Sequence, residues 1–264
     1  VHRGARWPGR VPARVQARSV LPRVLEPLVD LVLPRVCAGC GHPGCLLCPR
    51  CAALLARPRL ATPRRHPDGF PPTVAAAAYA GPVRPVVNAF KEHGRTELAA
   101  PLGAALALAV VVVRAGAGGG PVLLVPLPSS RAAVRERGRD HVAELTRAAV
   151  RELRRAGVPV TAARLLGRRG RVRDSAGLDA RQRRANLAGT FVLREPVRRG
   201  SGLLVVVDDV VSSGASVTEA AAVLIPAARR HDTPVVAAVV AATPRGRPVA
   251  AVGPGPGVFT VRER

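Results

Sequence analysis

The stretch that decides the fold is Leu203–Ser216, which reads LLVVVDDVVSSGAS. It opens with five apolar residues, and such a short run bounded by turn residues is typical of a buried parallel strand. Two adjacent carboxylates, Asp208 and Asp209, end the run, and two valines separate them from a turn of small residues, Ser212–Ser216. The sequence after the turn predicts a helix. We therefore expect a strand, a small-residue loop and a helix, with two acids where the strand ends.

This arrangement predicts a site for a phosphorylated sugar. A loop of small residues that enters a helix leaves free N–H groups at the positive end of the helix dipole, which suits phosphate. The acids Asp208 and Asp209 cannot bind the same phosphate, because like charges repel, but they suit a polyol or a metal ion beside it. Two alternatives stay open: an ordinary strand-turn-helix with an acidic end, and, less favoured, the acid pair of a response regulator.

Strands and helices are expected to alternate along the chain, which predicts an α/β fold with a parallel sheet. Val122–Val125 is expected to be the first strand of the main sheet. Ligands of such sheets bind at the carboxyl ends of the strands, where Asp208 and the loop Pro126–Arg131 should both lie. Further strands are expected at 74–79, 158–161, 191–193 and 234–242, and helices at 52–56, 83–93, 97–114 and from Ser129 or Ser130 to 156, with a mobile loop at 167–186.

The five cysteines all lie in the short segment from Cys37 to Cys51, and their spacing predicts a metal site. The pattern C-x2-C-x7-C-x2-C gives two knuckles, and each can offer two thiolates to one tetrahedral Zn²⁺. Cys45 is a fifth thiol that also forms a CxxC with Cys48, so the choice of ligands stays ambiguous. A disulfide cluster is the alternative, but an odd count argues against it. The predicted ligands of a structural zinc ion are Cys37, Cys40, Cys48 and Cys51.

Composition bounds the size and the partners of the protein. Its 264 residues, 48% of them hydrophobic, suffice for one good-sized domain and a small module. The net charge of +24 favours polyanions as partners, although an arginine-rich, lysine-poor composition is also typical of a GC-rich genome. Residues 131–199 hold 19 arginines against 7 acids, a net charge of +12, and Lys91 is the only lysine of the chain.

No segment is expected to enter a membrane, and we expect a cytoplasmic protein. The longest apolar run, Leu102–Val113, is too short to span a bilayer. Residues 1–24 are basic like a targeting peptide, but Arg23, Glu26 and Asp30 interrupt the apolar part that follows.

Several segments together resemble a known family. LVVVDDVVSSGAS resembles the phosphoribosyl pyrophosphate (PRPP) motif of type I phosphoribosyltransferases. A cysteine ribbon in front of this motif is similar to the ComF family of competence-associated, phosphoribosyltransferase-like proteins. The resemblance covers residues 20–245 and rests on five elements in order. Besides the ribbon and the PRPP motif, they are an amphipathic helix at 21–33, the residues Tyr79, Gly81, Arg84, Lys91 and Gly94, and the segments 122–141 and 174–191.

The resemblance implies a type I phosphoribosyltransferase fold that binds PRPP with Mg²⁺. Asp208 and Asp209 would face the ribose hydroxyls, and Ser212, Ser213, Gly214, Ala215 and Ser216 would wrap the 5′-phosphate. Pro128, Ser129 and Ser130, with Arg131, would take the pyrophosphate, and Asp208, Asp209 and Arg131 would be the catalytic residues. The basic loop 168–184 would close over the substrate. The chain departs from the family at Arg139, Asp140 and His141, where Phe, Asn and Gln are usual.

Two classes of function follow. The first is a phosphoribosyltransferase, or a protein that senses PRPP or another phosphoribosyl compound. The second is a non-catalytic competence factor that binds single-stranded DNA or the competence helicase machinery, although aromatic residues for base stacking make up only 2% of the chain. The expected organisation is a basic arm and amphipathic helix at 1–33, a zinc ribbon at 34–60, a linker and helical hood at 61–119, the phosphoribosyltransferase domain at 120–245 and a flexible tail at 246–264.

Overall fold

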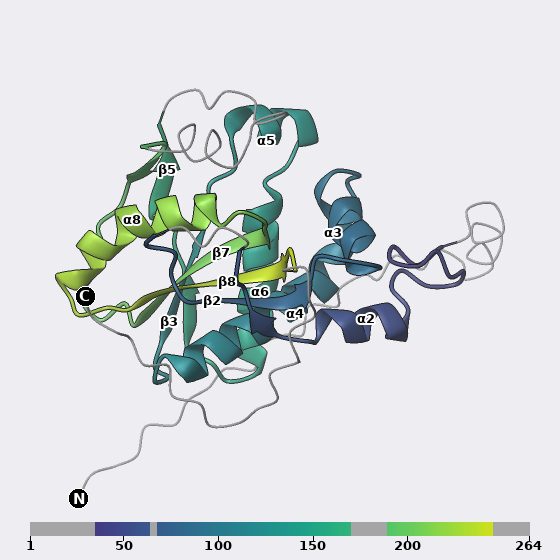
Figure 1. Ribbon diagram of the computed structural model, residues 1–264, viewed down its shortest axis with the longest axis horizontal. Helices are drawn as coiled ribbons and strands as arrows, with labels where there is room; N and C mark the ends of the chain where they lie inside the picture. The colour runs from purple at the N-terminus through teal and green to yellow at the C-terminus, as the bar shows by residue number, and fades with distance from the viewer. Residues whose placement is uncertain (1–34, 64–67, 170–188, 245–264) are drawn as a thin grey trace, which may run out of the picture. The chain divides into compact units, whose positions relative to one another are not determined.

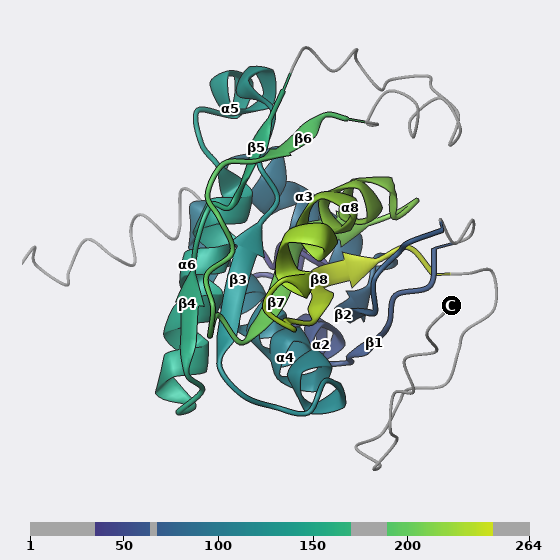
Figure 2. The same ribbon diagram turned by 90° about the vertical axis from the view of Figure 1, so that its left-hand side faces the viewer.

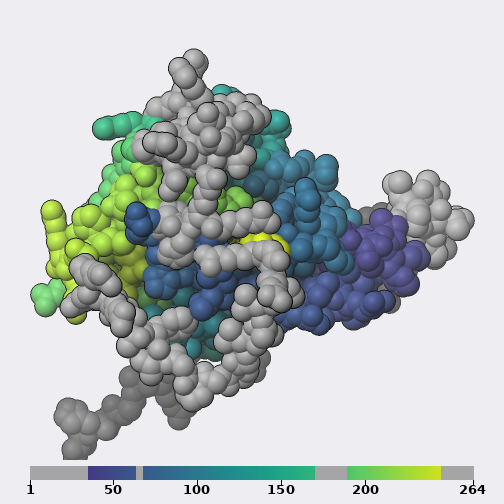
Figure 3. All heavy atoms as spheres, in the orientation of Figure 1, coloured from purple at the N-terminus to yellow at the C-terminus, as the bar shows by residue number. Residues whose placement is uncertain are grey.

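The computed structural model describes residues 35–63, 68–169 and 189–244 (Figure 1). The amphipathic helix predicted at 21–33, most of the basic loop at 168–184 and the tail at 246–264 lie outside the described residues. From Val36 onward the described residues belong to one compact unit. In the space-filling view, the purple atoms of the cysteine module adjoin the blue atoms of the segments that follow it in the chain (Figure 3).

The centre of the protein is a six-stranded sheet, so the prediction of an α/β fold with a mostly parallel sheet is confirmed (Figure 2). Five strands run parallel, and a two-residue strand pairs antiparallel at one edge. A separate hairpin pairs two short strands. In spatial order, the sheet consists of β1 Arg59–Leu60, β2 Thr73–Ala78, β8 Val235–Ala242, β7 Leu203–Val211, β3 Val122–Pro126 and β4 Val160–Ala162, and the hairpin of β5 Leu166–Arg168 and β6 Phe191–Leu193.

Helices cover both faces of the sheet and bury a core on each. Alternate residues of β7 belong to different cores: Val205 packs with α4 and α6, whereas Val206 packs with α8. A strand that is buried on both faces needs apolar residues at successive positions, which explains the unbroken run at the start of β7. The helices are α2 Pro49–Leu55, α3 Val83–Lys91, the 3₁₀ turn η1 Thr96–Leu98, α4 Ala99–Gly116, α5 Arg131–Arg137, α6 His141–Arg155 and α8 Ala215–Arg229.

Two expectations about the elements are wrong. The first parallel strand of the main sheet is β2 and not the strand at Val122, because β2 pairs with β8, and the short β1 precedes it at the edge. The single helix expected from Ser130 to Ala156 is two helices, α5 and α6. Gly138 separates them in the left-handed conformation, with φ of 67°, which glycine adopts at the end of a helix without strain. The side chain of Asp140 then caps α6 by accepting from the N–H of Ala143.

Two further segments are more extended than the sequence indicates. β7 does not end before the acids, because it continues through Asp208 and Asp209 to Val211. Gly167 and Arg168, expected in a loop, belong to β5 and pair with β6. In both cases a neighbouring strand supplies the hydrogen bonds, which local sequence patterns do not record.

One helix is longer than the apolar run within it. The helical segment Thr96–Gly116 is long and apolar enough to cross a membrane by length and composition, and half of it is buried inside the protein. Its buried side packs against β2, β8 and α6, where Gly103 touches Ala148 with no room for a side chain. Its length and apolar character therefore also fit a core helix of the sheet.

Candidate functional site

The connections of the sheet diverge at the carboxyl ends of β3 and β7, the place where open α/β sheets form a ligand-binding crevice, and we refer to this place as the crevice. These strands are neighbours, with Pro126 paired to Val207. After β3 the chain continues to α6 on one face of the sheet, and after β7 it continues to α8 on the other. Ligands of open α/β sheets bind where successive connections diverge in this way. The loop after β3 and the acids of β7 lie together at this edge, as expected.

The two acids of β7 do different things, because adjacent residues of a strand point to opposite faces. Asp209 is only 3% exposed and lies on the face covered by α3 and α6. Its Oδ2 lies 2.9 Å from the Lys91 Nζ and 3.2 Å from the His141 Nε2. Its Oδ1 accepts a hydrogen bond of 2.7 Å from the N–H of Val210. Asp209 is therefore enclosed by protein groups.

These contacts keep Asp209 ionised. Burial alone would raise the pKa of its carboxyl group, but the neighbouring His141 and Lys91 outweigh burial and hold that pKa below its usual range. For Lys91, burial would lower the pKa of the amine, but Asp209 raises it by more. Each charge thus stabilises the other in a site that water reaches poorly.

Asp208 is the half-buried acid of the pair. Its Oδ1 accepts a hydrogen bond of 2.9 Å from the N–H of Asp209. Burial and the charge of Asp209 raise the pKa of Asp208 well above its ordinary value, and Lys91 offsets only part of this. On the hairpin, burial lowers the pKa of Arg168, whose guanidinium lies 5.2 Å from the centre of the Phe191 ring, and Asp208 opposes part of that shift. Asp208 is thus the acid that a ligand or cation can reach.

The loop after β7 presents the start of α8 to the same edge. Gly214 is the N-cap residue, with φ of 78°, and it has no side chain to cap the helix, while the N–H of Ala215 donates to the Oγ of Ser213 at 3.4 Å. A Cβ at Gly214 would lie 2.8 Å from the Phe70 ring, so only glycine fits. Among the loop serines, Ser212 is exposed and Ser216 is half-buried. The uncapped N–H groups at the start of this long helix, beside small side chains, can accept an anion.

The loop after β3 is partly committed to its own structure. Ser130 caps α5, because its Oγ accepts from the N–H of Ala133 at 3.1 Å. Ser129 donates to the Oδ1 of Asp140 at 3.3 Å. Pro128 is half-buried and Arg131 is exposed. All four predicted residues lie at the carboxyl end of β3. Both serine hydroxyls already make hydrogen bonds within the protein, so a ligand would have to share these bonds or break them.

Sequence reasoning missed the partners of Asp209. In the sequence, Lys91 is one residue of the family resemblance, and His141 is a departure from it. Neither observation connects them to a strand that lies much further along the chain. His141 is 4% exposed, and its Nδ1 has no hydrogen-bond partner among the described residues. Two signals could have identified these residues. Lys91 is the only lysine of the chain, and His141 stands where the family that the chain resembles usually has glutamine.

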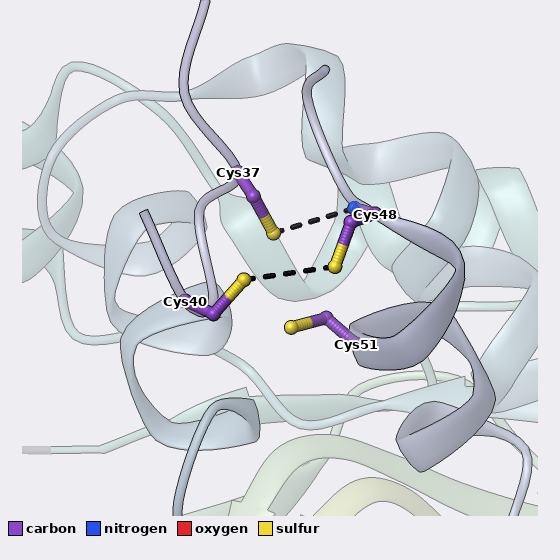
Figure 4. Close-up of side chains that lie close together, drawn as sticks. All are labelled: Cys37, Cys40, Cys48 and Cys51. Carbon is purple, nitrogen blue, oxygen red and sulfur yellow. Dashed lines mark hydrogen bonds between the residues drawn. The ribbon is translucent and has the colours of Figure 1, made fainter. Parts of the chain in front are cut away.

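The four predicted zinc ligands converge on one point (Figure 4). All their Sγ atoms lie within 4.8 Å of one another, and the Sγ atoms of Cys40 and Cys48 are 3.6 Å apart. Four thiolates around a tetrahedral zinc ion are separated by about 3.8 Å, given a Zn–S distance of about 2.3 Å. All five cysteines are free thiols, and Cys45 is not part of the four-thiol cluster. These four cysteines could therefore bind a structural metal ion such as zinc.

Backbone geometry explains how the thiols meet. Cys37 begins a tight turn in which the N–H of Gly41 bonds to its carbonyl oxygen, and Cys48 is the N-cap residue of α2, one turn before Cys51. Burial would raise the pKa of Cys37, but N–H groups of Cys48 and Gly39 donate to its sulfur and bring that pKa to about 6. Burial raises the pKa of Cys51. The donated hydrogen bonds thus favour the thiolate form of Cys37, which is the form that binds a metal ion.

A cavity of about 550 Å³ lies at the opposite edge of the sheet. Its lining includes Thr73 and Val74, which begin β2, and Val235 and Val236, which begin β8. It is therefore separate from the acids at the carboxyl ends of the strands. The chemistry favours the crevice over this cavity, because the crevice combines carboxylates with a helix N-terminus.

Sequence comparisons do not assign the chain to a family. No protein-family model matches it. No curated protein is significantly similar to it.

Proposed function

We propose that the protein binds a phosphorylated sugar of the PRPP type, together with Mg²⁺, in the crevice between β3 and β7, as a phosphoribosyltransferase or as a PRPP-dependent regulator of the ComF type. The observation that carries this proposal is the half-buried Asp208 beside the uncapped, glycine-started α8 at the point where the connections of the sheet diverge. An acid for hydroxyls and a helix N-terminus for phosphate are the two parts that a sugar phosphate requires.

The roles of the residues follow from their positions. The loop Ser212–Ser216 would hold the 5′-phosphate with backbone N–H groups and hydroxyls. Asp208 would accept hydrogen bonds from the ribose hydroxyls or contact the Mg²⁺ of the substrate. Asp209 would act through its neighbour: held by Lys91 and His141, it keeps the end of β7 in place and adds negative charge behind Asp208.

In the transferase version, catalysis would come from positioning and electrostatics. As pyrophosphate leaves, positive charge develops at C1 of the ribose and negative charge on the leaving group. Asp208, near the end of β7, would face the former. Arg131, exposed after β3, and Arg168 on the hairpin are the cations of this edge that could stabilise the latter, because a guanidinium binds phosphate oxygens in a bidentate manner.

Isothermal titration with PRPP and Mg²⁺ tests the proposal. Asp208→Asn should weaken binding at least about tenfold, since it removes a charge-assisted hydrogen bond or a cation contact. Asp232→Asn is the matched control, because it removes the same charge at the opposite edge of the sheet and should leave affinity unchanged. Ribose 5-phosphate and pyrophosphate, each added in a separate experiment, should compete with PRPP for binding. Absence of PRPP binding by the folded parent protein, or equal losses in both variants, would contradict the proposed site.

A further inference from the structure

Helix α3 carries Lys91 as its last residue, and its first turn rests on the cysteine module. Pro82 is the N-cap residue of α3, and its carbonyl oxygen would lie 3.1 Å from a Cβ at Gly39. The same Cβ would lie 2.8 Å from the Sγ of Cys51. There is no room for a side chain here, so the turn between the first two cysteines fits directly between a predicted metal ligand and the start of α3.

Leu47 connects the cysteine cluster to the main core. It packs against the buried thiols of Cys37, Cys48 and Cys51 and also against the large core that contains α3. Leu54, on α2, packs against the large core alone. The purple atoms of the module adjoin the blue atoms of the segments that follow it (Figure 3). A change in the thiol cluster can therefore reach the base of α3 through Leu47 and the close contact at Gly39, which are among the connections between the module and the large core.

The other end of α3 is fixed by two arginines: Arg137, the last residue of α5, and Arg139, between α5 and α6. The Nη1 of Arg139 donates to the carbonyl oxygen of Phe90 at 2.5 Å. Arg137 pairs with Glu92 through two hydrogen bonds, of 2.7 and 3.1 Å. These bonds hold the residues on either side of Lys91. The reach of the lysine to Asp209 thus depends on how α3 is held at both ends.

We infer that the metal-loaded cysteine module positions Lys91 through α3, so that metal binding is coupled to the charge and shape of the Asp208–Asp209 edge. Four thiolates drawn to one ion would fix the module, and the module would hold the first turn of α3. Without the metal, the first turn would lose its support, and the Lys91–Asp209 pair would open more often. The coupling goes beyond the proposed function, and only its consequence for sugar-phosphate binding rests on that function.

Because Lys91 is the only lysine, its reactivity reports the state of this pair directly. An amine-acylating reagent modifies Lys91 only when the amine leaves Asp209, and peptide mass spectrometry separates this product from the acylated N-terminus. We expect acylation of the full chain to be about 5- to 100-fold faster after zinc removal by a chelator, the range of typical couplings between protein sites. Unchanged reactivity in a metal-free protein that stays folded by circular dichroism would overturn the inference.

A matched pair of variants decides the matter if the metal-free protein unfolds. Leu47→Ala, measured with saturating Zn²⁺, should raise the reactivity of Lys91 several-fold, whether or not the variant keeps its zinc. Leu54→Ala removes an equal volume from the large core away from the thiols and should leave the reactivity near that of the parent. Equal reactivity in the folded Leu47→Ala variant and the parent would overturn the inference, as would equal increases in both variants.

The same samples separate this inference from the proposed function. If Lys91 reactivity responds to zinc but PRPP does not bind, the coupling stands and the proposed ligand is wrong. If PRPP binds with equal affinity and Lys91 reacts equally with and without zinc, the proposed function stands and the coupling is wrong.

Discussion

The cysteine module and the acidic edge of β7 each bring residues of one kind close together, but they arrange them in opposite ways. In the module, four thiols from two separate knuckles turn toward one point, with sulfur atoms within 4.8 Å. At the edge, two adjacent carboxylates turn to opposite faces of one strand, and only Asp209 is enclosed by Lys91 and His141. The first arrangement could bind a metal ion, whereas in the second Asp209 is already paired with Lys91.

The contrast shows what a cluster of charges requires. The four thiols could together bind a metal ion, and a site of four thiolates is closed, which gives it a structural character. Asp209 already has Lys91 and His141, so it has no need of a metal ion. Asp208 has neither partner within hydrogen-bonding distance among the described contacts, and it is the acid left for an external ligand.

The largest expected effect is the loss of the metal site. Cys48→Ser removes one ligand and should abolish stoichiometric zinc in protein purified without chelator, with a local destabilisation of at least about 5 kcal/mol, because zinc binding is itself folding energy in small modules. Metal analysis and thermal unfolding measure both effects. Cys45→Ser should retain zinc, since Cys45 is not one of the four converging thiols. The reverse result would move Cys45 into the ligand set.

The second effect is the loss of the ion pair between Lys91 and Asp209. Lys91→Met leaves Asp209 buried without its principal cation and should cost about 3–5 kcal/mol in the free energy of unfolding, as for other buried pairs that lose one partner. Arg155→Met is the control, because Arg155 pairs with Glu152 in an exposed position worth about 0.2–1 kcal/mol. Denaturant unfolding compares the two. A Lys91→Met variant as stable as the control variant would show that His141 alone suffices for Asp209.

The two regions also differ in how far the sequence predicts them. The thiol cluster comes from one short segment, Cys37–Cys51, and its spacing predicts the four converging ligands, because turns and one helix start determine the geometry locally. The acid pair is equally visible in the sequence, as are the buried strand before it and the helix after it. The sequence does not show that β7 continues through the acids, because the hydrogen bonds that extend it come from β8.

Partners from distant segments are the part that could not be predicted. Lys91 and His141 meet Asp209 only because α3 and α6 pack on the same face of the sheet. The break at Gly138 places His141 at the start of α6. The pattern of apolar residues does not show this break, because it predicts one continuous helix. Packing of separate helices on a sheet decides such contacts, and a single sequence carries no record of it.

The smallest expected effect concerns pH and tests the difference between the two acids. The pKa of Asp208 is raised in the folded state, so its favourable contribution is complete below the ordinary pKa, near 4, and is lost as pH rises through the raised value. The pKa of Asp209 is lowered, so its contribution is present above pH 4 and is lost only in stronger acid. Between pH 4 and 7 the two acids therefore differ in their effect on stability. Of the two, only Asp208 should make the fold less stable as the pH rises.

Asp208→Asn keeps the shape of the side chain and removes its titration. Relative to the parent, the variant should gain stability as the pH rises from 4 to 7, because it lacks the carboxyl group whose pKa is raised in the folded state. Denaturant unfolding of both proteins at each pH, with saturating Zn²⁺, gives this difference, and Asp232→Asn should show none of it. If the difference between the Asp208→Asn variant and the parent is constant over that range, Asp208 is ionised throughout, and the raised pKa that distinguishes it from Asp209 is wrong.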